Sequence, residues 1–284
     1  MAYLDHIKAC NTCDIAGFRG FWVDGLRVGW VRHALAEQLS SFPDTVTVTD
    51  NGVYLSRRYH SFESRTRAMA QMITALVARG TIPPLRCEQY PVFRSWQGEA
   101  LFALDRAAVP YFGTIAYGLH VNGYLRQPDN SLHLWIATRA RDRAVAPGKL
   151  DNLIAGGQPI GLSLTENLIK EAFEEAGIGP DLAQRAVPAG TVTYRLETPQ
   201  GLKVDCLFVY DMEVPPDFVP RNTDGEVESF ALLSSERVAE IVRETDDFKF
   251  NCNLVVIDFM IRHALIGPDH PDYIALGAGL RSWG

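Results

Sequence analysis

The chain has 284 residues, 47% of them hydrophobic and 21% charged, and 27 basic against 34 acidic residues give a net charge of −7. Its length fits one large domain or two ordinary ones, and its composition excludes long disorder, a collagen-like fibre and a coiled coil. The negative charge argues against a general nucleic-acid or anionic-membrane binder, and no apolar run is long enough to span a bilayer. Five scattered cysteines and no recognisable signal peptide lead us to expect a cytoplasmic location.

The first third of the chain predicts an α+β unit that ends near residue 110. Turn signals at Asp24-Gly25 and at Asp50-Asn51-Gly52 indicate two hairpins, with strands over 18–22, 27–31 and 45–54. Helical periodicity predicts helices over 32–39 and 64–78, the second ended by Gly80. A strand over 86–94 and a short helix over 101–108 complete the unit.

From residue 115 the pattern predicts a mixed sheet with helices packed on its faces. The strands are expected over 115–125, 132–139, 190–196, 204–213 and 227–233. A loop is expected from 147 to 157, and helices over 164–176, 235–243 and 253–265. We therefore expect an α+β protein with two domains, residues 1–110 and 111–284.

The predicted helix over 164–176 concentrates three carboxylates within an arc of about 100°, those of Glu171, Glu174 and Glu175. The neighbouring arc, expected to face the core, holds the apolar residues Ile169, Ala172, Phe173 and Ala176. Like charges at this spacing repel each other, so the helix favours a bound cation, and hard oxygen ligands select Mg²⁺ or Mn²⁺.

A solvated acidic face is the alternative for such a cluster taken alone. The glycine pair upstream, Gly156-Gly157, favours the metal site because glycine lets the backbone approach a cation closely and offers its carbonyls as ligands. Diphosphate chemistry needs this combination of cations and a carboxylate that positions or activates water.

The same segment resembles the Nudix box, G-x5-E-x7-R-E-U-x-E-E-x-G-U with U a bulky apolar residue, and matches it well from Lys170 to Ile178. Lys170 stands where the box has Arg, which keeps the charge but loses the planar fork. Leu162 stands where the box has its first Glu, and the glycine pair matches only with a one-residue deletion in the loop. That first Glu is usually a supporting residue, so we interpret these departures as features of a subgroup.

The surrounding sequence is similar to the Nudix subgroup related to thiamine diphosphate, whose members occur fused to thiamine pyrophosphokinase in fungi and as separate enzymes in plants. The similar stretches are 112–113, 117–124, 150–155, 166–171, 208–211 and 251–259. Members of this subgroup carry an extra N-terminal domain of about the length seen here. The resemblance therefore implies a Nudix α/β/α sandwich with a mixed sheet over residues 111–284, preceded by a smaller α+β domain.

The resemblance also implies a set of site residues. Its metal ligands are Glu171, Glu174, Glu175 and the carbonyl of Gly156, which would hold Mg²⁺ or Mn²⁺. The three glutamates are also the catalytic set, with Glu171 as a candidate base. A fourth catalytic carboxylate is expected from a later segment, where Glu226 is preferred to Glu228, and strand alternation places those two on the same face.

Substrate contacts are expected from Tyr117, Lys170 and Gln158. Aromatic strand residues are candidates to bind a cationic ring, although such residues are more often part of a core: Tyr117, Tyr124, Trp135 and Tyr194. His120, in an alternating strand, fits a hydrogen-bonded structural role better than a catalytic one. The Cys10-x-x-Cys13 pair has no second pair at zinc spacing and reads as incidental or structural.

The leading hypothesis is a metal-dependent hydrolase of thiamine diphosphate or its oxidised or damaged forms, yielding the monophosphate and phosphate. One alternative is a Nudix hydrolase of a nucleotide or a nucleoside-diphosphate conjugate. Another is a degenerate Nudix domain that binds a ligand without turnover, supported by Leu162 and Lys170 alone. The expected partner is a small diphosphate, with no nucleic acid or membrane. The N-terminal unit either covers the base-recognition side of the pocket or mediates a homodimer.

Overall fold

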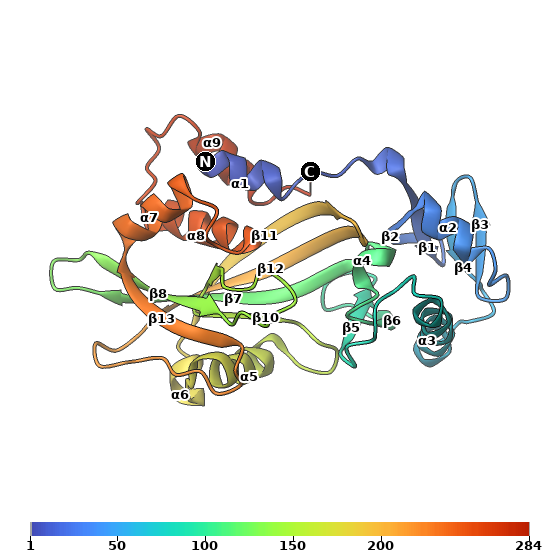
Figure 1. Ribbon diagram of the computed structural model, residues 1–284, viewed down its shortest axis with the longest axis horizontal. Coiled ribbons are helices and arrows are strands. Elements are labelled where there is room, and N and C mark those ends of the chain that lie inside the picture. The colour runs from blue at the N-terminus through green and yellow to red at the C-terminus, as the bar shows by residue number, and fades with distance from the viewer. Residues whose placement is uncertain (1, 284) are drawn as a thin grey trace.

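The strands form a four-stranded, a two-stranded and a seven-stranded sheet in the computed structural model, which describes residues 2–283 (Figure 1). The four-stranded sheet has the order β2-β1-β4-β3, built from β1 (Phe18–Val23), β2 (Leu26–Arg32), β3 (Val46–Thr49) and β4 (Gly52–Leu55). A 3₁₀ turn (Ile15–Gly17) precedes it, α2 (His33–Leu39) follows β2, and α3 (Phe62–Ala78) follows β4. Both predicted hairpins and both predicted helices are therefore present.

Local chemistry sets the limits of these elements. At the first turn, Asp24 and Gly25 have φ of 50° and 79°, and such positive values at both central residues match the right-handed twist of the flanking strands. The α3 helix begins after Ser61, whose hydroxyl accepts the N–H of Ser64 at 3.2 Å. Positive φ at Gly80, 73°, lies just beyond its end, where the sequence placed the stop.

The helix predicted over 101–108 is wrong, because residues Ala100–Asp105 form strand β6. This strand pairs antiparallel with β5 (Gln89–Phe93), with Tyr90 opposite Leu104. Five consecutive residues of β6 are buried, so the segment shows no alternation that would distinguish a strand from a buried helix. The pairing partner decides the structure here, not the local sequence.

The seven-stranded mixed sheet has the order β11-β12-β7-β8-β13, with β10 also paired to β7 and β9 to β8. Its strands are β7 (Ile115–Arg126), β8 (Leu132–Arg139), β9 (Leu150–Asp151), β10 (Ile154–Gly157), β11 (Val187–Thr198), β12 (Gly201–Glu213) and β13 (Val227–Ser234). Strands β12 and β7 run parallel, and the other pairs are antiparallel. The expected mixed sheet is confirmed, whereas the expected loop over 147–157 contains the strands β9 and β10.

Helices cover both faces of this sheet (Figure 1). On one face α5 (Leu164–Ala176) and α6 (Pro180–Ala183) share a hydrophobic cluster with Leu119 and Val121 of β7. On the other, α7 (Ser235–Glu244) and α8 (Phe250–Arg262) pack over β8, β11 and β12 around a cluster that includes Val209 and Phe259. This is the α/β/α arrangement expected for the C-terminal region.

The first helix packs against helices from the C-terminal part of the chain. Helix α1 (Tyr3–Ala9) packs against α8 and α9 (Tyr273–Gly279), and buries Tyr3 and Ile7 in the same cluster as α8. The N-terminal sheet has its own cluster around Phe21 and Phe102. Short α4 (Val109–Phe112) connects the two regions, near the predicted boundary at residue 110, which stays a prediction. Within residues 2–283, no helix has the length and apolar character needed to cross a bilayer.

Candidate active site

Helix α5 carries the three candidate carboxylates and is fixed at both ends. Ser163 caps its start by accepting the Glu166 N–H at 3.2 Å, while the Glu166 carboxylate accepts the Ser163 N–H at 2.8 Å. Gly177, with φ of 66°, ends it in the left-handed conformation that glycine adopts without strain. The helix predicted over 164–176 is confirmed.

The buried stripe of α5 differs from the prediction at one position. Leu168, Ala172 and Ala176 are buried, but Phe173 is 57% exposed. The stripe follows the i, i+4, i+8 row, and Phe173 lies about 100° around the helix from Ala172. The expectation that Phe173 faces the core is therefore wrong.

Strand β10 brings the glycine pair against the carboxylates. A Cβ atom at Gly156 would lie 2.3 Å from Cδ of Glu171, so a larger residue there would displace that carboxylate from its present position. A Cβ at Gly157 would lie 1.6 Å from the hydroxyl oxygen of Tyr90, which reaches over from the N-terminal region. Both glycines thus allow the close approach of a side chain, that of Glu171 to Gly156 and that of Tyr90 to Gly157.

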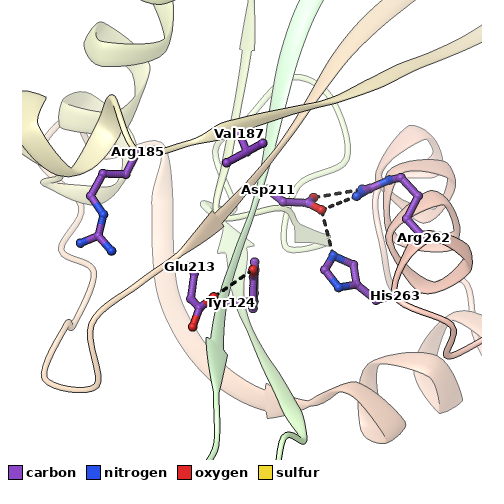
Figure 2. A pocket seen from close by; sticks show the side chains of 7 residues that line it. All are labelled: Tyr124, Arg185, Val187, Asp211, Glu213, Arg262 and His263. Atoms are coloured by element: carbon purple, nitrogen blue, oxygen red, sulfur yellow. Dashed lines mark hydrogen bonds and ion pairs between the residues drawn. The ribbon is translucent and has the colours of Figure 1, made fainter.

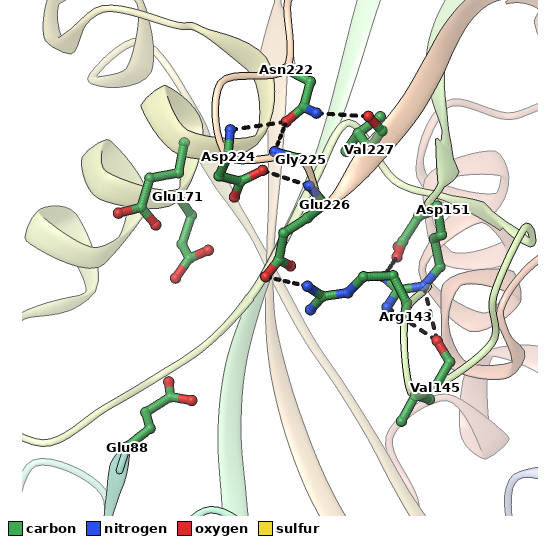
Figure 3. A network of polar contacts seen from close by, with 12 residues as sticks. Glu88, Arg143, Val145, Asp151, Glu171, Asn222, Asp224, Gly225, Glu226 and Val227 are labelled. Carbon is green, nitrogen blue, oxygen red and sulfur yellow. Dashed lines mark hydrogen bonds and ion pairs between the residues drawn. The ribbon is translucent and has the colours of Figure 1, made fainter. Parts of the chain in front are cut away.

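The three carboxylates of α5 line a polar cavity of about 210 Å³. Its lining comes from both regions of the chain and consists of Glu88, Arg106, Arg139, Arg143, Ala155, Gly156, Gly157, Lys170, Glu171, Glu174, Glu175, Asp224, Glu226 and Lys249. All four predicted catalytic glutamates and Gly156 therefore share one cavity with several cationic side chains. Figure 3 shows Glu88, Glu171 and Glu226 around this space.

Glu175 is the most buried of the three, at 7% exposure, and its carboxylate accepts the Ala155 N–H at 2.7 Å. Burial, and then the negative charges of Glu171 and Asp151, raise the pKa of Glu175 to about 8. Burial also raises the pKa of Glu171. A buried pair of carboxylates with raised pKa values is a donor set that a divalent cation would stabilise in its ionised form, so these residues fit a hard metal ion.

Lys170 partly balances this charge. Its Nζ lies 2.6 Å from a carboxylate oxygen of Glu174 and 3.1 Å from one of Glu171. A single ammonium group bridging two carboxylates holds their relative orientation, although it lacks the planar fork of an arginine. Lys170 also lines the cavity, as expected of a residue that contacts substrate.

Glu226 and Glu228 differ in position, because one precedes strand β13 and the other lies within it. The strand begins at Val227, so Glu226 lies just before it, and the expected strand alternation does not apply to the pair. Glu226 reaches the cavity and pairs with Arg143 at 2.5 Å (Figure 3). Glu228 instead pairs with exposed Arg141 at 3.5 Å.

Tyr117 and Gln158 lie beside the cavity but do not line it. Gln158 is buried, and its side-chain amide donates to the carbonyl of Leu162 at 2.7 Å, which braces the segment before α5. Tyr117 belongs to a half-buried aromatic cluster with Phe93, Trp96 and Phe208, in which the centroids of Trp96 and Tyr117 are 4.5 Å apart.

None of the other three aromatic candidates lines the carboxylate cavity. Tyr194 is completely buried and hydrogen-bonds to Asp205, which excludes it from contact with a ligand. The Trp135 ring packs edge-on against Phe218, and Tyr124 lines a different cavity. The ring-binding expectation is wrong for Tyr194 because that strand position faces the α8 core.

Behind the cavity lies a buried polar network centred on Asp151. Its carboxylate pairs with Arg139 at 2.6 Å, and Lys249 approaches it at 3.5 Å. The opposite carboxylate oxygen accepts from the thiol of Cys252 at 2.6 Å. Next to this group His120, buried as expected of a structural histidine, hydrogen-bonds through Nδ1 to the Asn152 side chain at 2.8 Å. Asp151 thus holds the cationic side chains of Arg139 and Lys249 at the cavity wall.

A larger cavity of about 390 Å³ lies elsewhere, at the end of β7 and β12 (Figure 2). Most of its polar groups are paired, since Arg262 and His263 both bind Asp211, and the Tyr124 hydroxyl donates to Glu213 at 3.2 Å. Size alone would select this cavity, but the carboxylate helix and the glycine strand form the smaller one, which we take as the candidate active site.

Several lining residues were not found by sequence reasoning: Glu88, Arg106, Arg139, Arg143, Asp224 and Lys249. They come from four separate segments that only the tertiary fold brings together. Arg139 ends β8 and Arg143 follows it in a basic stretch, a local signal that could have indicated an anion site. Nothing near Glu88 or Arg106 distinguishes them from surface residues.

Comparisons with known proteins bear on the whole chain. A family model described as a domain of unknown function (DUF4743) matches residues 2–116. Nudix hydrolase 24, chloroplastic, of Arabidopsis thaliana is 43% identical over 284 residues, covering 99% of this chain and 78% of that protein. Nudix hydrolase 20, chloroplastic, of the same plant is 41% identical with the same coverage, and the uncharacterized protein YJR142W of Saccharomyces cerevisiae is 28% identical over 89% of this chain and 80% of that protein.

A carboxylate helix and a glycine strand that meet in one cavity of an α/β/α domain define a Nudix enzyme. With relatives above 40% identity along nearly its full length, this chain belongs to the Nudix hydrolase family. It is a hydrolase of diphosphate bonds with a DUF4743 region at its N-terminus, in a family that typically depends on a divalent metal.

Proposed function

We propose that this Nudix hydrolase cleaves the diphosphate of thiamine diphosphate, or of its oxidised or damaged forms, to the monophosphate and phosphate. The observation that carries the chemistry is the cavity that joins Glu171, Glu174 and Glu175 to cationic side chains. The choice of substrate is supported by the resemblance over 150–155 and 251–259, and by the aromatic cluster beside the cavity.

The residues that would hold Mg²⁺ or Mn²⁺ are Glu171, Glu174 and Glu175, with the Gly156 carbonyl. When bound, such an ion screens the diphosphate and stabilises charge on the leaving phosphate. Glu171 accepts the proton of the attacking water as the water oxygen bonds to phosphorus. The bridging P–O bond breaks, and the leaving oxygen keeps the electron pair. Lys170 holds Glu171 and Glu174 in orientation through its two ion pairs.

We assign recognition of the organic ring to the cluster of Tyr117 and Trp96. The Gln158 N–H donates to the Tyr117 carbonyl at 2.8 Å, which places the backbone of Tyr117 next to the residue that follows Gly157, a lining residue of the cavity. A molecule with a diphosphate at one end and a ring at the other can therefore contact both places. A cationic ring against an aromatic face gains roughly 0.5–2 kcal/mol, depending on desolvation.

The same aromatic faces would also stack a nucleobase, which keeps a nucleotide or a nucleoside-diphosphate conjugate as the second candidate substrate. A non-catalytic binding role has less support, because the three glutamates are intact and share the cavity.

A substrate panel with Mg²⁺ separates these candidates. We expect kcat/KM for thiamine diphosphate or its oxidised form to exceed that for ADP-ribose, NADH and nucleoside triphosphates by at least about tenfold, or roughly 1.4 kcal/mol of transition-state binding. EDTA should abolish turnover, and Mg²⁺ or Mn²⁺ should restore it. A nucleotide that wins the comparison would overturn the thiamine assignment, and a metal-loaded protein inactive on the whole panel would favour the binding role.

A further inference from the structure

The N-terminal region supplies one wall of the active-site cavity. Glu88 directly precedes β5, and Arg106 directly follows β6, so the two residues close the open end of this hairpin. The Arg106 N–H donates to the Glu88 carbonyl at 2.8 Å, which keeps their side chains next to each other. Both line the cavity together with the carboxylates of α5, and Figure 3 shows Glu88 across the space from Glu171.

The β5–β6 hairpin packs against strand β10, which carries Gly156 and Gly157. The hydroxyl of buried Tyr90 occupies the space left by the missing side chain of Gly157. A further backbone bond joins the Ile160 N–H to the Gln89 carbonyl at 2.9 Å. The Arg106 guanidinium lies 5.8 Å from the centre of the Tyr90 ring. The cavity end of the hairpin therefore has a defined position relative to β10.

Most N–H donors of the Arg106 side chain have no hydrogen-bond acceptor among residues 2–283. Its Nη1 donates to Glu88 at 2.8 Å, and no other acceptor for the side chain is found among residues 2–283. Its side chain is 52% exposed. Arg139 differs, since its Nε, Nη1 and Nη2 all donate, to Val145 and Asp151. A guanidinium with one partner still offers most of its planar fork to an anion.

We propose that Arg106 binds a phosphate of the substrate, and that the DUF4743 region thereby completes the active site. The proposal rests on the proposed diphosphatase function, but not on the identity of the organic group. A diphosphate in the cavity would present some oxygens to the wall of Glu171, Glu174 and Glu175 and others to Arg106. Glu88 is a positioning residue that directs the fork of Arg106 into the cavity. The hairpin thus joins phosphate recognition to the region that also carries Trp96 of the aromatic cluster.

The test uses the full chain and measures binding of inorganic pyrophosphate with Mg²⁺ by calorimetry, beside steady-state kinetics on the best diphosphate of the panel. Arg106→Met keeps most of the apolar stem and removes the charge. We expect it to raise the pyrophosphate Kd at least about tenfold and to lower kcat/KM by a similar factor, mainly through KM. Arg106→Lys should recover part of the loss, because charge returns without the fork. Arg67→Met, at an exposed arginine of α3, is the control and should change neither value by more than about twofold.

The role of Glu88 is tested by a double-mutant cycle. Glu88→Ala should weaken pyrophosphate binding less than Arg106→Met, Glu88→Gln should restore it, and the double variant should be no worse than Arg106→Met alone. Folded Arg106→Met protein with wild-type Kd and KM would overturn the proposal, as would wild-type protein that does not bind the Mg²⁺–pyrophosphate probe. Loss of thiamine preference in the panel would leave these binding results unaffected, so the two proposals fail separately.

Discussion

The three glutamates of α5 differ in burial, and we expect this difference to decide how much each contributes to holding a cation. Glu175 is 7% exposed and accepts a backbone N–H, whereas the Glu174 side chain is 40% exposed and pairs with Lys170. Electrostatic effects grow as water is excluded, so the buried carboxylate should contribute most to holding a cation. Sequence spacing identified all three residues but could not rank them.

Replacing Glu175 with Gln tests this ranking. The substitution keeps the shape and the acceptor for Ala155 but removes the charge, so kcat should fall at least about a hundredfold. Steady-state kinetics at saturating Mg²⁺ gives the measurement, and Glu37→Gln, at an exposed glutamate of α2, is the matched control. Full activity of Glu175→Gln would remove this residue from the site.

A second prediction concerns the pH dependence of stability through His120. Burial, and then the positive charge of Lys249, lower the pKa of His120 from 6.5 to about 4, against the opposing effects of Asp151, Asn152 and Asp205. Between about pH 6.5 and about pH 4, His120 therefore binds a proton in the unfolded chain but not in the folded one. The contribution of His120 to the free energy of unfolding is lost as the pH falls through that window. The full contribution is about 3 kcal/mol, since each pH unit between the two pKa values is worth about 1.4 kcal/mol.

Denaturant unfolding of metal-free protein at pH 7 and pH 4.5 measures this effect. In His120→Gln the loss of stability between the two pH values should be smaller than in the wild type by on the order of 2 kcal/mol. The same substitution at exposed His60 controls for the removal of a histidine. An unchanged pH dependence in His120→Gln would contradict the assignment.

At the scale of elements, α5 and β10 form the proposed metal-binding unit, and the sequence predicted these two elements with unequal success. Apolar spacing and a terminal glycine are local signals, so the helix was predicted over 164–176, the bounds that α5 has. The glycine strand was expected to be a loop, because two adjacent glycines carry no strand signal. Its pairing with β7, which places Gly156 opposite Leu119, is a long-range contact.

The β6 strand shows the same limit. Its apolar run is equally consistent with a helix, and only β5 supplies the partner that makes it a strand. For the site, the carboxylates of one helix could be predicted from spacing, whereas Glu88 and Arg106 could not. Side chains that meet only through tertiary packing leave no periodic pattern in the sequence.

The third prediction follows from the repulsion within α5. A cation that binds only the native state stabilises it, by about 2.7 kcal/mol at a concentration a hundred times the Kd. Saturating Mg²⁺ should therefore raise the Tm of the wild type clearly more than that of a Glu174→Gln, Glu175→Gln double variant, as measured by calorimetry with and without EDTA. Equal shifts in the two proteins would mean that the cation binds elsewhere.

At the scale of the whole molecule, the N-terminal and C-terminal regions contact each other at several places, including these three. Tyr90 fits against Gly157, Arg32 pairs with Glu197 at 2.9 Å, and α1 packs on α8 and α9. These contacts connect the small sheet to the site and the first helix to the core of the large sheet. We therefore expect the chain to unfold as one cooperative unit.

Ile7 tests the contribution of α1. It is 4% exposed and lies against α9, where a Cβ at Gly279 would be 2.7 Å from its Cγ2. Ile7→Ala should lower the free energy of unfolding by about 2–4 kcal/mol, through lost apolar burial and the cavity left behind. Ile274→Ala, on α9 at 85% exposure, should change it by less than about 0.5 kcal/mol. A second, separate transition in Ile7→Ala would contradict the single cooperative unit.

The packing of α1 also bears on how the chain is made. A ribosome adds roughly 5–20 residues per second, and domains generally fold as they emerge. Helix α1 leaves the ribosome well before α8 and α9, the helices that cover Tyr3 and Ile7. For roughly 12–50 seconds of translation its apolar face has no native partner. Helix α1 therefore reaches its native contacts only after the segments that form α8 and α9 have been made.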